Sequence, residues 1–234
     1  MKNITSKRQL FLDFGRDYDA SLSNFFFSKA DQVLKNEILA VLQFQKKKDL
    51  FITGGNSSGK TFLLNSILND AEISKKTIYV DLSKLTQNQD YFKDFETFDL
   101  ICLDNIDLMH ANLEIQLFNL INDSRTSEAS LILASSQPLN LIKVFPDLFS
   151  RLKEINFFKL NPIDGDEANE CLAFLAPKIG LHIEHDALDL ISKKIRRDFK
   201  SIKKALIEFD KFLYSEKKQP TKMSAASFLK NYLS

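Results

Sequence analysis

The chain has 234 residues, of which 44% are hydrophobic and 27% are charged. This composition is typical of a folded protein with one large domain and room for a small appendage. Its 32 lysines and arginines nearly balance its 31 aspartates and glutamates, so we expect no direct sequence-specific DNA binding, which usually requires a basic excess. No apolar run reaches the roughly 18 residues of a membrane span, and two scattered cysteines with three histidines predict a cytoplasmic protein without a disulfide or zinc framework.

The N-terminal part of the chain is expected to consist of an extended segment over residues 1–23 and a helix over Ser28–Gln45. Within the extended segment, Gln9-Leu10-Phe11-Leu12-Asp13-Phe14 carries alternating apolar residues. Such alternation is typical of an edge strand. It fits equally well a peptide that docks in extended form on a partner, and the pattern by itself favours neither.

Five short runs of apolar and β-branched residues follow from Leu50 onward, and segments of helical periodicity separate them. Strands that are buried on both faces of a parallel sheet appear as near-continuous apolar runs. The runs are Leu50–Thr53, Thr77–Leu82, Leu100–Leu103, Leu131–Ser135 and Ile155–Leu160. We therefore expect a doubly wound α/β domain over residues 24–161, with a five-stranded parallel sheet flanked by helices.

After Pro162 the pattern becomes helical throughout, with Gly180 and Pro220 as breaks. The predicted helices are Asp164–Ile179, His185–Ile195, Asp198–Tyr214 and Met223–Leu233. We therefore expect a small all-helical lid domain over residues 162–234.

The segment Gly54–Thr61 matches the phosphate-loop motif G-x-x-x-x-G-K-[ST] without a mismatch, between a predicted strand and a predicted helix. Glycines let successive backbone N–H groups turn towards a phosphate, and the start of the helix adds positive potential. Lys60 is expected to reach the β- and γ-phosphates. The alternative is a Gly/Ser-rich turn that binds no ligand. The residues expected to bind ADP or ATP are Gly54, Gly55, Asn56, Ser57, Ser58, Gly59, Lys60, Thr61 and Phe62.

Asp104 follows the apolar run Leu100–Leu103 and is expected at the carboxyl edge of the sheet, where ligands bind. We predict that its carboxylate and the Thr61 hydroxyl hold Mg²⁺, although an aspartate there can also simply end a strand. The next residue is Asn105, whose amide can orient a water molecule but cannot accept its proton. Weak intrinsic hydrolysis is therefore expected, with the reach of the nearby Asp107 left open.

Three further polar residues follow in order: Ser136 after a predicted strand, Arg151 at the end of a short helix, and Lys200 at the start of the third lid helix. Taken one at a time, each residue has an ordinary structural explanation: a serine in a turn, an arginine in contact with solvent and a lysine on the surface. With the phosphate loop and Asp104, their order resembles the DnaA-related AAA+ family from Phe25 to the C-terminus, and most of all its shortened Hda group, which inactivates the initiator DnaA. The resemblance implies that Ser136 is a first sensor, Arg151 an arginine finger acting in trans, and Lys200 a second sensor. Lys200 stands where the family usually has arginine, so only a point charge remains for the phosphate.

The resemblance also implies partners. In the Hda group, a hexapeptide near the N-terminus binds the sliding clamp of DNA polymerase, and Gln9, Leu10, Leu12 and Phe14 match it. The glutamine amide would form hydrogen bonds while the leucine and phenylalanine enter an apolar cleft. The helix-turn-helix domain that the initiator carries after its lid is not expected here. The implied protein is a regulator that, with the DNA-loaded clamp, stimulates hydrolysis of DnaA-bound ATP, and homo-oligomerisation is compatible with that role.

Two other functions remain open. The intact phosphate loop fits an autonomous ATPase, such as a helicase loader related to DnaA, although Asn105 and the clamp-like peptide weigh against it. The chain also fits a DnaA-like adaptor for some other partner. We favour a nucleotide-binding regulator over an enzyme.

Overall fold

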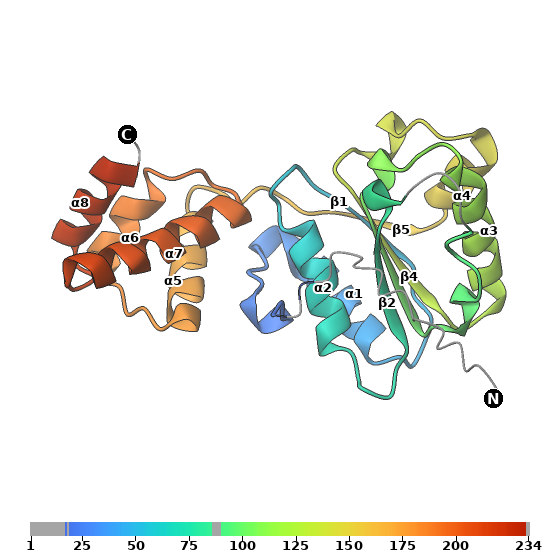
Figure 1. Cartoon of the computed structure of the whole chain (residues 1–234), viewed down its shortest axis with the longest axis horizontal. Coiled ribbons are helices and arrows are strands. Elements are labelled where there is room, and N and C mark those ends of the chain that lie inside the picture. Colours follow the sequence, from blue (N-terminus) through green and yellow to red (C-terminus); the bar gives the residue numbers. More distant parts are fainter. Residues whose placement is uncertain (1–16, 18, 86–89, 233–234) are drawn as a thin grey trace, which may run out of the picture.

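The computed structural model describes residues 17, 19–85 and 90–232, which form an α/β part and a helical part lying side by side (Figure 1). The strands are β1 (Leu50–Thr53), β2 (Thr77–Asp81), β3 (Leu100–Asp104), β4 (Ser130–Ser135) and β5 (Asn156–Lys159). The helices of the α/β part are α1 (Gln32–Leu42), α2 (Lys60–Asp70), α3 (Leu113–Thr126) and α4 (Pro146–Lys153). Short 3-10 helices join them at Leu22–Asn24, Lys29–Asp31, Leu82–Lys84, Phe95–Thr97, Ile106–Leu108 and Leu139–Leu141.

All five strands are parallel, in the order β2-β3-β4-β1-β5. This confirms the predicted sheet. β1, β3 and β4 are buried along their whole length, as apolar runs predict. β5 differs, because it is an edge strand whose described strand partner is β1, and three of its four residues are exposed.

Alternate residues of the central strands enter two separate cores, since successive side chains of a strand point to opposite faces. Leu50 and Ile52 of β1 pack in the core that includes Ile38 of α1 and Ile67 of α2. Phe51, between them, packs in the core formed with α3 and α4. Figure 1 shows these two pairs of helices on opposite sides of the sheet. Each fully buried residue of this size stabilises the fold by roughly 1.5–3 kcal/mol.

The helical part consists of α5 (Glu167–Leu175), α6 (His185–Ser192), α7 (Phe199–Glu216) and α8 (Lys222–Tyr232), which confirms the predicted helical region. The first predicted helix changes to a 3-10 helix over Ala176–Ile179 and ends at Gly180, whose φ of 79° suits glycine. α6 ends at Ser192, earlier than predicted.

The helical part shares its hydrophobic core with one face of the sheet. Phe25 and the α2 residue Leu63 belong to the same buried cluster as Ile202 and Phe209 of α7. The ring of Phe25 stacks on that of Phe199, with centroids 5.0 Å apart. This packing fixes the position of the helical part beside α2.

Near the N-terminus, the described chain runs along α2. Asn65 accepts a hydrogen bond from the Asp17 backbone N–H at 2.8 Å, and Asp70 accepts one from Leu22 at 2.9 Å. Residues 22–24, at the end of the segment expected to be extended, form a 3-10 turn because the Ser21 hydroxyl accepts a hydrogen bond from the Ser23 backbone N–H. The hexapeptide over residues 9–14 lies outside the described residues. Among the described helices, none is long and apolar enough to cross a membrane.

Candidate functional site

The phosphate loop connects β1 to α2 at the carboxyl edge of the sheet. Gly59 precedes α2 with a φ of 97°, and a Cβ at this position would lie 3.0 Å from the Phe25 ring and 3.1 Å from the Phe199 ring. A Cβ at Gly54 would lie 2.7 Å from the Ser58 hydroxyl oxygen. Gly59 is therefore required by the conformation and packing of the loop, whereas a side chain at Gly54 would be crowded mainly by the backbone and Cβ of Leu160, at 3.2 and 3.1 Å.

Lys60, the first residue of α2, is only 6% exposed. Its ammonium group donates to the backbone carbonyls of Gly54 at 2.7 Å and Gly55 at 3.1 Å. Burial lowers the pKa of Lys60, while the nearby carboxylates of Asp104 and Asp107 oppose this shift. Because few groups compensate this buried cation, an anion bound in the loop would stabilise its charged form.

Asp104 ends β3 and is fully buried. Its carboxylate accepts hydrogen bonds from the Thr61 hydroxyl at 2.6 Å, the Tyr79 hydroxyl at 3.1 Å and the Asn105 backbone N–H at 2.9 Å. Burial raises the pKa of Asp104, and these three hydrogen bonds oppose the shift. The two residues predicted to hold Mg²⁺ are therefore in direct contact.

This donor set fits a magnesium ion. A hydroxyl and a carboxylate are hard oxygen ligands, and Mg²⁺ typically takes one or two protein groups and completes its shell with water and substrate phosphates. In the described part of the chain, no cluster of three or more histidine, cysteine or acidic residues is arranged for a metal. The arrangement therefore suits a metal that arrives with a phosphate ligand better than a metal held by protein alone.

Sequence reasoning missed Tyr79 and Asp81 of β2. In the parallel ladder Tyr79 pairs with Cys102, and Asp81 pairs with Asp104. Burial, followed by the effect of the Asp104 carboxylate, raises the pKa of Tyr79, so its hydroxyl stays protonated and donates. The signal available in the sequence was that Asp81 lies near the end of the predicted strand Thr77–Leu82, just as Asp104 follows the predicted strand Leu100–Leu103.

Asn105 follows β3 in the left-handed conformation, with a φ of 59°. Its side-chain amide donates to the Asp81 carboxylate at 2.7 Å. Asp107 lies in the short 3-10 helix that follows, and its carboxylate accepts a hydrogen bond from the Ser136 backbone N–H at 2.9 Å. Asp107 therefore positions the segment after β4.

A cavity of about 520 Å³ opens beside the loop. Its lining brings the loop together with the two predicted sensors and with polar residues of α2. The lining residues are Asp17, Asn56, Ser57, Gly59, Lys60, Thr61, Phe62, Asn65, Asn105, Ser136, Phe199, Lys200 and Lys203. Gly54, Gly55 and Ser58 belong to the loop but do not line this cavity. The Ser58 hydroxyl is buried, with no hydrogen-bond partner among the described residues.

The start of α7 forms one wall of this cavity. The Lys200 backbone N–H donates to the Ser57 carbonyl at 3.4 Å, and Phe199 packs against Gly59. Lys203, one helical turn after Lys200, lies with its ammonium group 4.2 Å from the centroid of the Phe62 ring. Lys203 was not predicted, although helical spacing places it near Lys200.

Arg151 does not line the cavity. It lies in α4, and its guanidinium pairs with Glu154 at 3.4 Å. It also lies 6.0 Å from the centroid of the Phe118 ring of α3. Arg125 pairs with the same Glu154. Arg151 therefore belongs to the α3–α4 layer and not to the wall formed by α2 and α7.

The fold matches solved structures of AAA+ proteins. Domain III of the Thermotoga maritima replication initiation protein DnaA superposes with a TM-score of 0.79 at 18% identity, over 92% of this chain and 98% of that domain. AMPPCP-bound DnaA from Aquifex aeolicus gives 0.72 at 18% identity, over 85% of this chain and 68% of that one. The Thermotoga maritima RuvB Holliday junction branch migration motor gives 0.71 at 16% identity, over 90% and 71%. The chain thus has the AAA+ fold of DnaA domain III.

Sequence comparison shows similarity to individual proteins but to no family model. No family model matches the chain. An uncharacterized protein of Haemophilus influenzae is 29% identical over 214 residues, which cover 87% of this chain and 90% of that protein.

Proposed function

We propose that the cavity binds an adenine nucleotide together with Mg²⁺. The observation that carries this proposal is the 2.6 Å hydrogen bond between Thr61 and Asp104 at the base of a phosphate loop with the buried cation Lys60. Mg²⁺ would neutralise phosphate charge there, with Thr61 and Asp104 as its protein ligands. The match to a DnaA structure that contains AMPPCP also supports an adenine nucleotide.

The surrounding residues would hold the nucleotide more readily than hydrolyse it. Lys60 would leave the Gly54 and Gly55 carbonyls for the phosphates, and Lys200 and Ser136 face the same cavity. Asn105 offers no carboxylate, and its amide is already bonded to Asp81. Hydrolysis by the chain itself would therefore be slow.

We further propose that the chain is a regulator of replication initiation. In this proposal Gln9, Leu10, Leu12 and Phe14 bind the DNA-loaded sliding clamp, and Arg151 acts on ATP bound to DnaA. The match to DnaA domain III supports the family assignment behind this role. The location of Arg151 outside the cavity, in the α3–α4 layer, is compatible with action on the nucleotide of another chain.

The nucleotide site is tested by Lys60→Ala, with Lys76→Ala as a control that removes an exposed lysine before β2. Hydrogen bonds to charged groups contribute about 1.5–3 kcal/mol each, so the first variant should bind ADP at least about tenfold more weakly. The control should match the wild type. Calorimetry with Mg²⁺-ADP measures both, and thermal unfolding shows that both are folded. Unchanged affinity in a folded Lys60→Ala protein would remove the assignment of this loop.

A further inference from the structure

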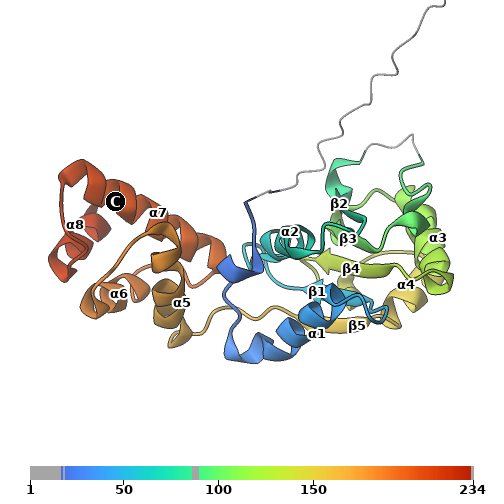
Figure 2. The same ribbon diagram turned by 90° about the horizontal axis from the view of Figure 1, so that it is seen from below.

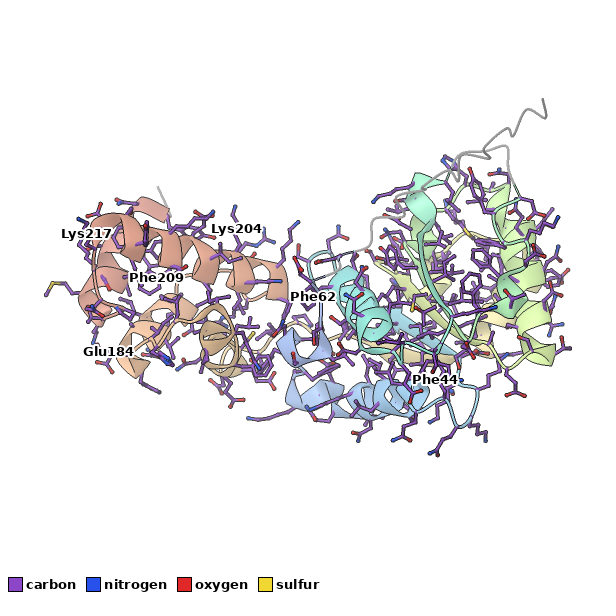
Figure 3. All side chains as sticks on the ribbon, turned by 60° about the horizontal axis from the view of Figure 1, so that its bottom comes forward. Phe44, Phe62, Glu184, Lys204, Phe209 and Lys217 are labelled. Atoms are coloured by element: carbon purple, nitrogen blue, oxygen red, sulfur yellow. The ribbon has the colours of Figure 1, made fainter. Side chains whose placement is uncertain are left out.

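Charge is strongly segregated within the helical part. Residues 162–192 contain seven acidic residues and one lysine, whereas residues 193–234 contain twelve lysines and arginines and four acidic residues. Figure 3 shows Lys204 and Lys217 on one edge of this part and Glu184 on the other, with Phe209 between them. The near-zero net charge of the whole chain hides this separation.

The basic residues of α7 share one face of the helix, with Lys200, Lys204 and Lys211 exposed and Lys203 half-buried. The buried side of the helix carries Ile202, Leu206, Phe209 and Leu213. The opposite side carries residues at the spacing of one helical face, and we call it the α7 face. It comprises Lys200, Lys203, Lys204, Ile207, Lys211 and Tyr214.

Most of the positive charge on the α7 face is not neutralised within the described chain. Lys204 is exposed and has no ion pair there. Lys211 pairs with Glu208 at 2.9 Å, but its side chain remains 66% exposed. The acidic side chains beside the face are Glu208 and Asp210, and they lie on its two flanks.

We propose that the α7 face binds the phosphate backbone of a nucleic acid without reading its sequence. Lys200 and Lys211 are about 16 Å apart along the helix axis. A duplex carries one negative charge per roughly 1.7 Å of its axis, so Lys204 and Lys211, which do not line the nucleotide cavity, would each lie close to a phosphate. Tyr214, which is 88% exposed, offers a ring at the end of the face on which a base or sugar of a single strand can stack.

The composition of the face favours a nucleic acid over an acidic protein or a membrane. A protein interface has an apolar core, whereas here the exposed apolar surface is limited to Ile207, which is 38% exposed, and the ring of Tyr214. Insertion into a membrane would require a wide apolar face. Phosphate binding needs only closely spaced cations. This inference does not depend on the proposed nucleotide site, because Lys204 and Lys211, on which it rests, do not line that cavity.

The test uses Lys204→Gln combined with Lys211→Gln, because neither residue lines the nucleotide cavity. The matched control is Lys46→Gln combined with Lys76→Gln, which removes two exposed lysines that precede β1 and β2. Lys204→Arg combined with Lys211→Arg keeps the charge. Fluorescence anisotropy would measure binding to a 25-nucleotide single strand and to the corresponding duplex at several salt concentrations, with polyglutamate as a competing polyanion.

Each lost phosphate contact makes the plot of log K against log salt shallower by about 0.7 for a single strand and 0.9 for a duplex. The glutamine variant should therefore lose about 1.4 from the slope for a single strand and about 1.8 for a duplex, while the control and the arginine variant keep the wild-type slope. A shallower slope for the glutamine variant with either nucleic acid supports the proposal, and it shows whether the face binds the single strand or the duplex. An unchanged slope for both, no binding by the wild type at low salt, or equal affinity for polyglutamate would overturn it.

Discussion

At the scale of single residues, a polar pair lies beside the cavity, formed by Asn105, which lines it, and Asp81. Asp81 at the end of β2 accepts hydrogen bonds from the Asn105 amide at 2.7 Å and from Ser83. The carboxylate of this pair is thus on β2, and the amide is on the segment after β3. A water molecule beside Asn105 would meet an amide that can align it but cannot take its proton.

Exchanging the two groups tests whether this pair limits hydrolysis. Asn105→Glu alone should change little, because the new carboxylate faces Asp81 and the two charges repel. Asn105→Glu combined with Asp81→Asn restores a hydrogen bond with its direction reversed and leaves a carboxylate by the cavity.

A positioned general base contributes on the order of 10²–10⁴-fold, so the double variant should hydrolyse ATP at least about tenfold faster than the wild type. Steady-state phosphate release measures this, and Asp81→Asn alone is the control. An unchanged rate in a double variant that still binds nucleotide would contradict this account of Asn105.

The phosphate loop could be predicted from the sequence because its residues are contiguous. The residues that reach the site from the neighbouring strand β2 could not. The loop over residues 54–61 is recognisable because its residue types recur at fixed spacing along the chain. Tyr79 and Asp81 contribute through strand pairing with β3, and no spacing rule connects them to Asp104. Lys203 reaches the cavity only because the start of α7 packs against the phosphate loop. The sequence pattern alone does not specify that packing.

At the scale of elements, a polar contact joins the 3-10 helix Lys29–Asp31 to the helical part. Glu167 of α5, only 8% exposed, accepts a hydrogen bond from the Lys29 backbone N–H at 2.7 Å. Close by, Asp31 accepts hydrogen bonds from Asn161 in the segment that leads to α5 and from Ser28. Figure 2 shows the described chain just before α1, drawn in dark blue, lying between the helical part and α1.

Two substitutions at Glu167 distinguish the contribution of its hydrogen bond to stability from that of its charge. Glu167→Ala leaves a partly buried backbone N–H without its acceptor and should lower the free energy of unfolding by about 1–3 kcal/mol. Glu167→Gln keeps an acceptor oxygen and should retain most of the stability. Urea unfolding followed by circular dichroism measures both, and equal stability of the two variants would show that this contact does not stabilise the fold.

Element boundaries were predicted well where local signals are strong and less well where packing decides. Gly180 correctly marked the end of the first helix of the helical part. β5 was expected to be buried like the other strands, but its exposure follows from its place at the sheet edge. An apolar run such as Phe157 and Phe158 does not reveal that position.

At the scale of the whole molecule, the two parts of the chain enclose the cavity, while Arg151 lies outside it. The start of α7 touches the phosphate loop through Phe199 and Lys200. Arg151 instead pairs with Glu154 in the α3–α4 layer. In the proposed function, Lys60 and Lys200 therefore act on the nucleotide of the chain itself, and Arg151 acts on that of a partner.

Release of phosphate from DnaA-bound ATP, in the presence of the DNA-loaded clamp, tests this account most directly. Arg125→Ala is a matched control, because Arg125 pairs with the same Glu154. An arginine finger supplied in trans can contribute on the order of a thousandfold or more, so Arg151→Ala should lose most of the stimulation while keeping its own affinity for ADP. The Arg125→Ala protein should stimulate like the wild type. Full stimulation by Arg151→Ala, or none by the wild type, would contradict the proposed function.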